Sequence, residues 1–133
     1  AVPLLIFMSK LIYEQESYSI RGGCFEVYKQ FRNRHKEKIY NRALVIYLKK
    51  HGLIVEQEKQ VPILFDGKKV GAYVPDIVVN GMIFLELKCK PCLTQDDIAQ
   101  FWYYLQATGF RLGFLVNFGN KNGVEIIRRV YGA

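Results

Sequence analysis

Apolar residues recur at helical spacing in the first third of the chain and predict two helices. The first runs from Glu14 to about Arg32, with an apolar face made of Ile20, Cys24, Val27 and Phe31. A basic, polar break, FRNRHKEK, follows. The second helix runs from about Lys36 to His51, where Gly52 ends it, and its apolar positions are Ile39, Ala43, Ile46 and Tyr47.

The middle of the chain has the composition of strands joined by tight turns. Leu53 to Phe65, Lys68 to Val79 and Met82 to Lys90 are rich in Val, Ile, Leu and Phe, and Asp-Gly and Asn-Gly pairs separate them. Such pairs are typical of β-hairpin turns. The pattern therefore predicts a three-stranded meander.

A further helix and two further strands follow the meander. Thr94-Gln95-Asp96-Asp97 resembles a capping box with Asp in place of Glu, and it opens a helix that runs to Thr108 and stops at Gly109. Phe110 to Phe118 and Val124 to Val130 are predicted strands. The order ααβββαββ, without linker or repeat, predicts one α/β domain over residues 1–133 with a mixed central sheet flanked by helices.

Residues 1–11 are expected to lie outside this core as an N-terminal stub, with Met8 as a candidate natural start. The apolar run AVPLLIFM is far shorter than the roughly 20 residues that span a bilayer. It also lacks the basic leader and small-residue cleavage site of a signal peptide. We therefore expect no membrane partner.

Charge and cysteine content narrow the class of partner and the compartment. The 133 residues carry a formal net charge of +7, which favours a polyanion such as nucleic acid. Three cysteines are an odd number, which favours a reducing compartment and predicts a cytoplasmic protein. Cys89 and Cys92 form a CxxC pair, but no second pair completes a zinc site, so they are interpreted as incidental.

Three charged residues interrupt the apolar strands: Asp76, Glu86 and Lys88. Glu86 and Lys88 share one face because side chains alternate along a strand. A strict two-residue turn at Asn80-Gly81 would send Asp76 to the opposite face, whereas a register one residue longer would pair it with Glu86. The longer register is predicted, with a divalent cation such as Mg2+ between the carboxylates. An ordinary ion pair on a solvent-facing sheet is the alternative.

These residues resemble the PD-(D/E)xK nuclease motif: Pro75-Asp76, then Glu86-Leu87-Lys88. Further matches resemble the GxxExxY branch of that superfamily over roughly residues 12–130. They are Glu37 and Tyr40, Phe25-Glu26-Val27, the QxxxY pair Gln100 and Tyr104, ATG at 107–109 and LVNFG at 115–119. Arg34 stands where the branch has its first glycine. The sequence therefore does not predict the backbone conformation of the basic loop.

The resemblance implies a restriction-endonuclease-like core and metal-dependent hydrolysis of phosphodiester bonds in nucleic acid, with DNA favoured over RNA. Asp76, Glu86, the Leu87 backbone carbonyl and Glu37 would hold Mg2+ or Mn2+. Lys88 would orient the attacking water or stabilise the transition state, and Gln100 and Tyr104 would brace Lys88 or the phosphate. A homodimer is expected by analogy.

Six basic residues are candidates for contact with the phosphate backbone: Arg32, Arg34, Lys36, Lys38, Lys68 and Lys69. No base-reading module is visible in the sequence. Two alternatives stay open: a non-catalytic nucleic-acid- or partner-binding module of the same fold, and a Holliday-junction-type resolving endonuclease.

Overall fold

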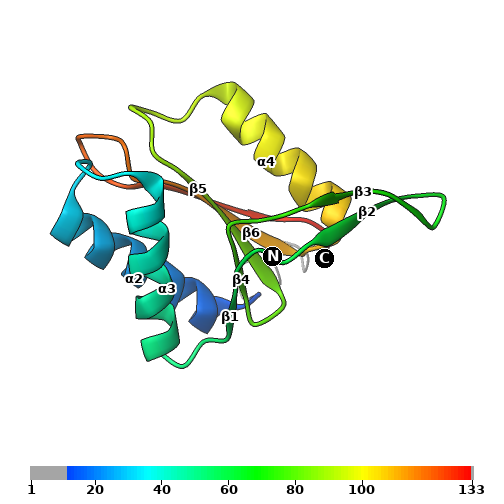
Figure 1. Cartoon of the computed structure of the whole chain (residues 1–133), viewed down its shortest axis with the longest axis horizontal. Helices are drawn as coiled ribbons and strands as arrows, with labels where there is room; N and C mark the ends of the chain where they lie inside the picture. Colours follow the sequence, from blue (N-terminus) through cyan, green and yellow to red (C-terminus); the bar gives the residue numbers. More distant parts are fainter. Residues whose placement is uncertain (1–11, 133) are drawn as a thin grey trace, which may run out of the picture.

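The computed structural model describes residues 12–132, and Figure 1 shows their arrangement. Three helices are present in this part of the chain: α2 (Glu14–Phe31), α3 (Glu37–Lys50) and α4 (Gln95–Thr108). The strands are β1 (Val55–Glu56), β2 (Val61–Phe65), β3 (Lys68–Tyr73), β4 (Ile77–Val79), β5 (Ile83–Lys88), β6 (Leu112–Asn117) and β7 (Glu125–Val130). The prediction for residues 1–11 lies outside the described residues.

Five strands form one mixed sheet in the order β1-β4-β5-β6-β7. β5 and β6 pair in parallel, and α4 connects them, while the other neighbours in the sheet are antiparallel. The predicted fold class, a mixed sheet flanked by helices, is confirmed.

The helices cover opposite faces of the sheet, with α2 and α3 on one side and α4 on the other (Figure 1). Strand alternation divides the core accordingly. On β5, Ile83, Leu85 and Leu87 pack with α2 and α3, while Phe84 packs with Phe101 of α4. Even-numbered residues of β5 therefore face α4, and Glu86 and Lys88 are among them.

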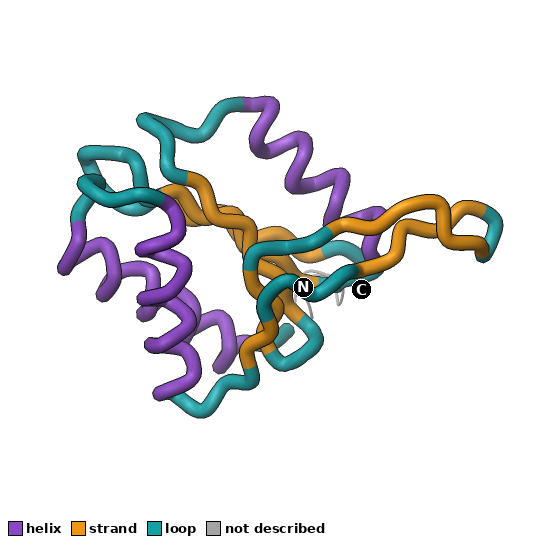
Figure 2. Tube along the Cα trace, viewed as in Figure 1, coloured by secondary structure: helices purple, strands orange, loops and turns teal. Residues whose placement is uncertain are grey.

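The pairing of the predicted three-stranded meander is confirmed, but its first two strands are each interrupted. Glu58 adopts a positive φ of 57°, which separates β1 from β2. Val74 and Pro75 separate β3 from β4, and proline cannot donate to a strand ladder. As a result β1 and β4 stay in the main sheet, while β2 and β3 form a separate hairpin that projects from it (Figure 2).

The predicted turn and cap chemistry is confirmed. Asp66 and Gly67 both have positive φ, at 53° and 76°, as a tight hairpin turn requires. At the start of α4, Thr94 Oγ1 accepts from the Asp97 amide at 3.2 Å, and Asp97 Oδ2 accepts from the Thr94 amide at 2.8 Å. Gly109 ends this helix with a φ of 78°. The boundaries of α4 therefore follow from local sequence.

Candidate active site

The hairpin between β4 and β5 decides which side chains meet. Val79 pairs with Ile83 and Ile77 pairs with Leu85, so the same register places Asp76 opposite Glu86. Asn80 and Gly81 both have positive φ, at 53° and 66°, and Met82 is an additional loop residue whose amide donates to the Val79 carbonyl at 3.1 Å. The longer of the two predicted registers is the observed one.

This register puts Asp76, Glu86 and Lys88 on the α4-facing side of the sheet. Asp76 is two residues from Val78, and Glu86 is two residues from Phe84, and both apolar residues belong to the core under α4. All three charged residues are half-buried. The site therefore lies where β4 begins and β5 ends, between the sheet and α4.

The backbone of β5 holds Asp76 in place. The Leu87 amide donates to Asp76 Oδ2 at 2.7 Å. Since the N–H and C=O of one strand residue point to the same edge, the Leu87 carbonyl lies on the Asp76 side of β5. A carboxylate oxygen and a backbone carbonyl oxygen are thus presented at one edge.

Burial and mutual repulsion raise the pKa values of two carboxyl groups of the site. The pKa of Glu86 is raised to about 7, first by burial and then by the negative charge of Asp76, while Lys88 acts in the opposite direction. The pKa of Glu37 is also raised, by partial burial of its carboxyl and by Asp76, again opposed by Lys88. Glu37 is the first residue of α3, so this helix brings a third carboxylate within electrostatic range of the strand pair.

Tyr73 belongs to this site, and the sequence analysis did not identify it. Its hydroxyl is buried without a hydrogen bond of ordinary geometry among the described residues. The nearby Glu86 carboxylate is a main cause, after burial, of the raised pKa of Tyr73. The only local signal was its position three residues before Asp76 in AYVPD.

Tyr104 reaches the site through Tyr73. The two rings stack with centroids 3.9 Å apart and planes at 11°. Gln100 lies one helical turn before Tyr104 on α4 and is exposed. The structure thus brings Tyr104 to the Glu86 side of the site, while a role for Gln100 stays a prediction.

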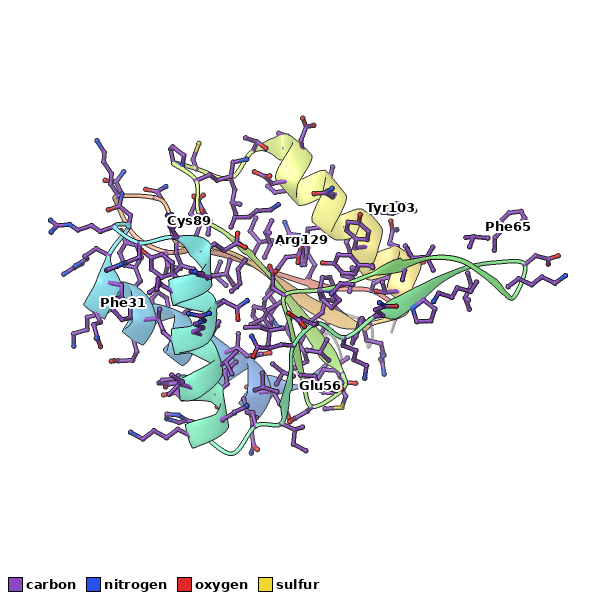
Figure 3. All side chains as sticks on the ribbon, in the orientation of Figure 1. Phe31, Glu56, Phe65, Cys89, Tyr103 and Arg129 are labelled. Carbon is purple, nitrogen blue, oxygen red and sulfur yellow. The ribbon has the colours of Figure 1, made fainter. Side chains whose placement is uncertain are left out.

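Tyr40 fixes the loop that leads into α3. This fully buried tyrosine stacks on Phe118 with centroids 4.6 Å apart. Its hydroxyl donates to the Arg32 carbonyl and accepts from the His35 amide. The Cys89 thiol, just after Lys88, donates to the His35 carbonyl at 3.2 Å (Figure 3 labels Cys89). Tyr40 therefore has a structural role, which sets the position of Glu37.

The question raised by Arg34 is answered by the backbone of this loop. Arg32 has a positive φ of 53°, whereas Arg34 is not among the residues with positive φ. A glycine is therefore not required at Arg34, and the loop accommodates the substitution without strain there.

Asn117 is the second residue that sequence reasoning missed, although it lies within LVNFG. Its buried side-chain amide accepts from the amides of Lys90 and Gly119 and donates to the Lys90 carbonyl and to Glu125 Oε1, all at 2.8–3.1 Å. Its backbone pairs with Lys88 in the parallel ladder. Asn117 therefore holds the segment that leaves Lys88.

The same segment is tied to α4 and packed closely. The Lys90 ammonium contacts Asp97 Oδ2 at 2.8 Å, and the pKa of Asp97 is lowered to about 2, chiefly by this hydrogen bond. A Cβ on Gly119 would lie 2.2 Å from the Lys90 nitrogen, so only glycine allows this approach. LVNFG therefore carries the framework behind Lys88.

The predicted basic residues lie in two exposed places. Arg32, Arg34, Lys36 and Lys38 surround the start of α3 next to Glu37, while Lys68 and Lys69 lie at the tip of the β2–β3 hairpin. All three cysteines of the chain are described and free. No helix among residues 12–132 is long and apolar enough to span a membrane.

A divalent cation fits the donor set in part. Within residues 12–132, no group of three or more His, Cys, Asp and Glu side chains is placed to hold a metal ion. The pair formed by Asp76 and Glu86 nevertheless has the chemistry of a cation site. Burial and the charge of Asp76 raise the Glu86 pKa, and a bound cation would stabilise both carboxylates in their charged form. Glu37 as a further ligand stays a prediction.

Comparison with known proteins agrees with this geometry. Residues 14–130 match the PD-(D/E)XK nuclease superfamily, and the chain belongs to that superfamily. The structure is similar to that of an alkaline exonuclease from Laribacter hongkongensis, with a TM-score of 0.51 and 16% sequence identity over 71% of this chain. The matched part is 56% of that enzyme, and at this identity the likeness concerns the fold. No curated protein matches the chain in sequence.

Proposed function

We propose that this protein is a nuclease that hydrolyses phosphodiester bonds in nucleic acid with the help of a divalent metal ion. The observation that carries the proposal is the register that sets Asp76 opposite Glu86, with Lys88 on the same face. Two carboxylates and a lysine on one edge of a half-buried sheet are a costly arrangement for a purely structural role.

Asp76, Glu86 and the Leu87 carbonyl would hold Mg2+ or Mn2+, and Glu37 would complete the site from α3. When bound, the metal supplies a Lewis acid that neutralises charge on the phosphate and acidifies water. Lys88 orients the attacking water or stabilises the negative charge of the transition state. Tyr104 braces the site through Tyr73, and Gln100 contacts the phosphate or Lys88.

The finer assignment is to the GxxExxY branch of the superfamily, supported by Glu37, Tyr40, Gln100 and Tyr104 in the positions described above. DNA is favoured over RNA on the family resemblance. The net charge of +7 and the exposed cluster Arg32, Arg34, Lys36 and Lys38 support a polyanionic substrate. Free cysteines support a cytoplasmic location. A homodimer remains an analogy with other small nucleases.

The test is cleavage of labelled single-stranded, duplex and branched DNA and RNA in Mg2+, Mn2+ or EDTA. Wild type is compared with Asp76→Ala and Lys88→Ala, and with the exposed controls Asp96→Ala and Lys49→Ala. We expect metal-dependent cutting that both site variants lose and both controls keep, with folding verified by circular dichroism.

Other outcomes lead to the alternatives. Binding without cutting under every condition would replace the proposal by a non-catalytic binding module. Cutting confined to four-way junctions would identify a junction-resolving endonuclease.

A further inference from the structure

The hairpin formed by β2 and β3 is the largest feature that the proposed chemistry does not use. It projects from the body of the molecule, and Figure 3 shows Phe65 at its far end. Ile63 pairs with Gly71 but Leu64 pairs with Lys69, so Val70 is an extra residue on β3. A β-bulge of this kind bends a strand and changes the direction of the following side chains.

Beyond the bulge, an apolar residue lies opposite a lysine on each face of the hairpin. Phe65 pairs with Lys68, and Leu64 pairs with Lys69. Directly opposed side chains lie on the same face, and neighbouring pairs lie on opposite faces. Phe65 is 74% exposed and Leu64 is 57% exposed. An aromatic ring and an ammonium group are therefore presented together, and most of the Phe65 side chain faces solvent.

We propose that the tip of this hairpin binds an unpaired strand of the nucleic-acid substrate, with Phe65 stacking on a base while Lys68 contacts a phosphate. The inference rests on the proposed nuclease function and specifies its substrate class. Bases in a duplex interior hide their faces, whereas single strands, overhangs and frayed ends expose them to aromatic side chains. The substrate therefore has unpaired nucleotides on the hairpin side of the cleavage site.

Charge favours this occupant over a second copy of the chain. Two copies that met tip to tip would bring their Lys68 and Lys69 ammonium groups together, and lysines on exposed strands oppose edge-to-edge pairing. A polyanion instead gains from both lysines and from the net charge of +7.

The base of the β2–β3 hairpin lies at the candidate active site. Tyr73, beside Glu86, pairs with Val61 at its base, and Phe65 lies four residues further along β2. At a rise of about 3.4 Å per residue, the tip is about 14 Å beyond Tyr73. With about 3.4 Å between nucleotides in one strand of a stacked helix, this distance corresponds to at most about four nucleotides. The shortest strands that occupy the site would not reach Phe65.

The experiment measures binding of labelled single-stranded oligonucleotides in EDTA, where turnover is not needed. Phe65→Ala and Phe65→Leu are expected to weaken binding by about fivefold to about a hundredfold, the range for loss of one base–aromatic stack. Phe65→Trp should retain binding. The strand should quench the fluorescence of the new indole, which is measured against the fluorescence of the single native tryptophan, Trp102. Tyr18→Ala is the matched control, since Tyr18 is an 82% exposed aromatic on α2.

A series of strands from about two to about twelve nucleotides should show the Phe65→Ala defect in strands of about four nucleotides or more and lose it in the shortest strands. Equal binding by wild type and Phe65→Ala at every length would overturn the proposal. So would a lower sedimentation mass for Phe65→Ala than for wild type, which would assign the tip to a second copy.

Failure of this inference and failure of the nuclease proposal are distinguishable. Normal cutting with no Phe65 effect on binding rejects the hairpin contact alone. A Phe65 effect on binding without any metal-dependent cutting rejects the nuclease alone. If no nucleic acid binds, both proposals fail.

Discussion

The Leu87 amide donates to Asp76 Oδ2 at 2.7 Å, so the strand that carries Glu86 also holds the other carboxylate of the site. Asp76→Asn retains an oxygen for this bond but removes the charge. We expect cleavage to fall at least about a hundredfold with little loss of stability. The Glu86 pKa should fall from about 7, because Asp76 is the second cause that raises it.

Carboxyl carbon NMR titration of the metal-free protein measures this shift alongside the cleavage assay. Asp96→Asn, on the exposed first turn of α4, is the control. An unchanged Glu86 midpoint in Asp76→Asn would show that the two carboxyl groups do not interact.

The raised pKa of Glu86 predicts how stability depends on pH. Between about 4.5 and about 7 the native state keeps a proton on Glu86 that the unfolded chain releases. Stability should therefore fall as pH rises through this window, by at most about 3 kcal/mol. Glu86→Gln should match wild type at the acid end and exceed its stability at pH above about 7. Denaturant unfolding in EDTA across this range measures both, with the exposed Glu26→Gln as control.

A divalent cation should reverse this loss. Carboxylates bind metal in their charged form. Mg2+ is therefore expected to raise the melting temperature more at about pH 8 than at about pH 5.5, two conditions on either side of the Glu86 pKa. Asp76→Asn should abolish the increase. Thermal melts with Mg2+ or EDTA test this, and an increase that persists in Asp76→Asn would place the cation elsewhere.

Asn117 is predicted to position Lys88 without touching substrate. Asn117→Ala leaves the Lys90 backbone and the Gly119 amide without their side-chain partner, at a cost of about 2–5 kcal/mol. In protein that remains folded, kcat should fall more than KM rises, because Lys88, which would be displaced, is proposed to act in the transition state. Asn122→Ala, an exposed asparagine in the same loop, should be neutral. Wild-type kcat in Asn117→Ala would contradict a positioning role.

Tyr40→Phe tests the loop that places Glu37. The change keeps the ring stacked on Phe118 but removes the hydroxyl that joins Arg32 to His35. We expect a loss of about 1–3 kcal/mol and a lower cleavage rate. Urea unfolding and cleavage measure the effect beside Tyr18→Phe, an exposed control. If stability falls while the rate is unchanged, the position of Glu37 does not matter for catalysis.

Local sequence determined the helices, the cap of α4 and the residues of the strand pair. The spacing of Ile20, Cys24 and Val27, and the capping box at Thr94, depend on neighbours within one or two turns. Charge within an apolar strand was enough to single out Asp76, Glu86 and Lys88, because burial of a charge is costly wherever the strand lies.

The tertiary structure decided what those residues meet. An Asn-Gly turn is compatible with a loop of two or three residues, so only pairing of the whole strands selects the register that joins Asp76 to Glu86. The break at Glu58 follows from β1 pairing with β4 while β2 leaves with β3. The contacts of Tyr73 with Tyr104 and of Asn117 with Lys90 join residues 31 and 27 positions apart, respectively, and such distant partners leave no periodic signal in the sequence.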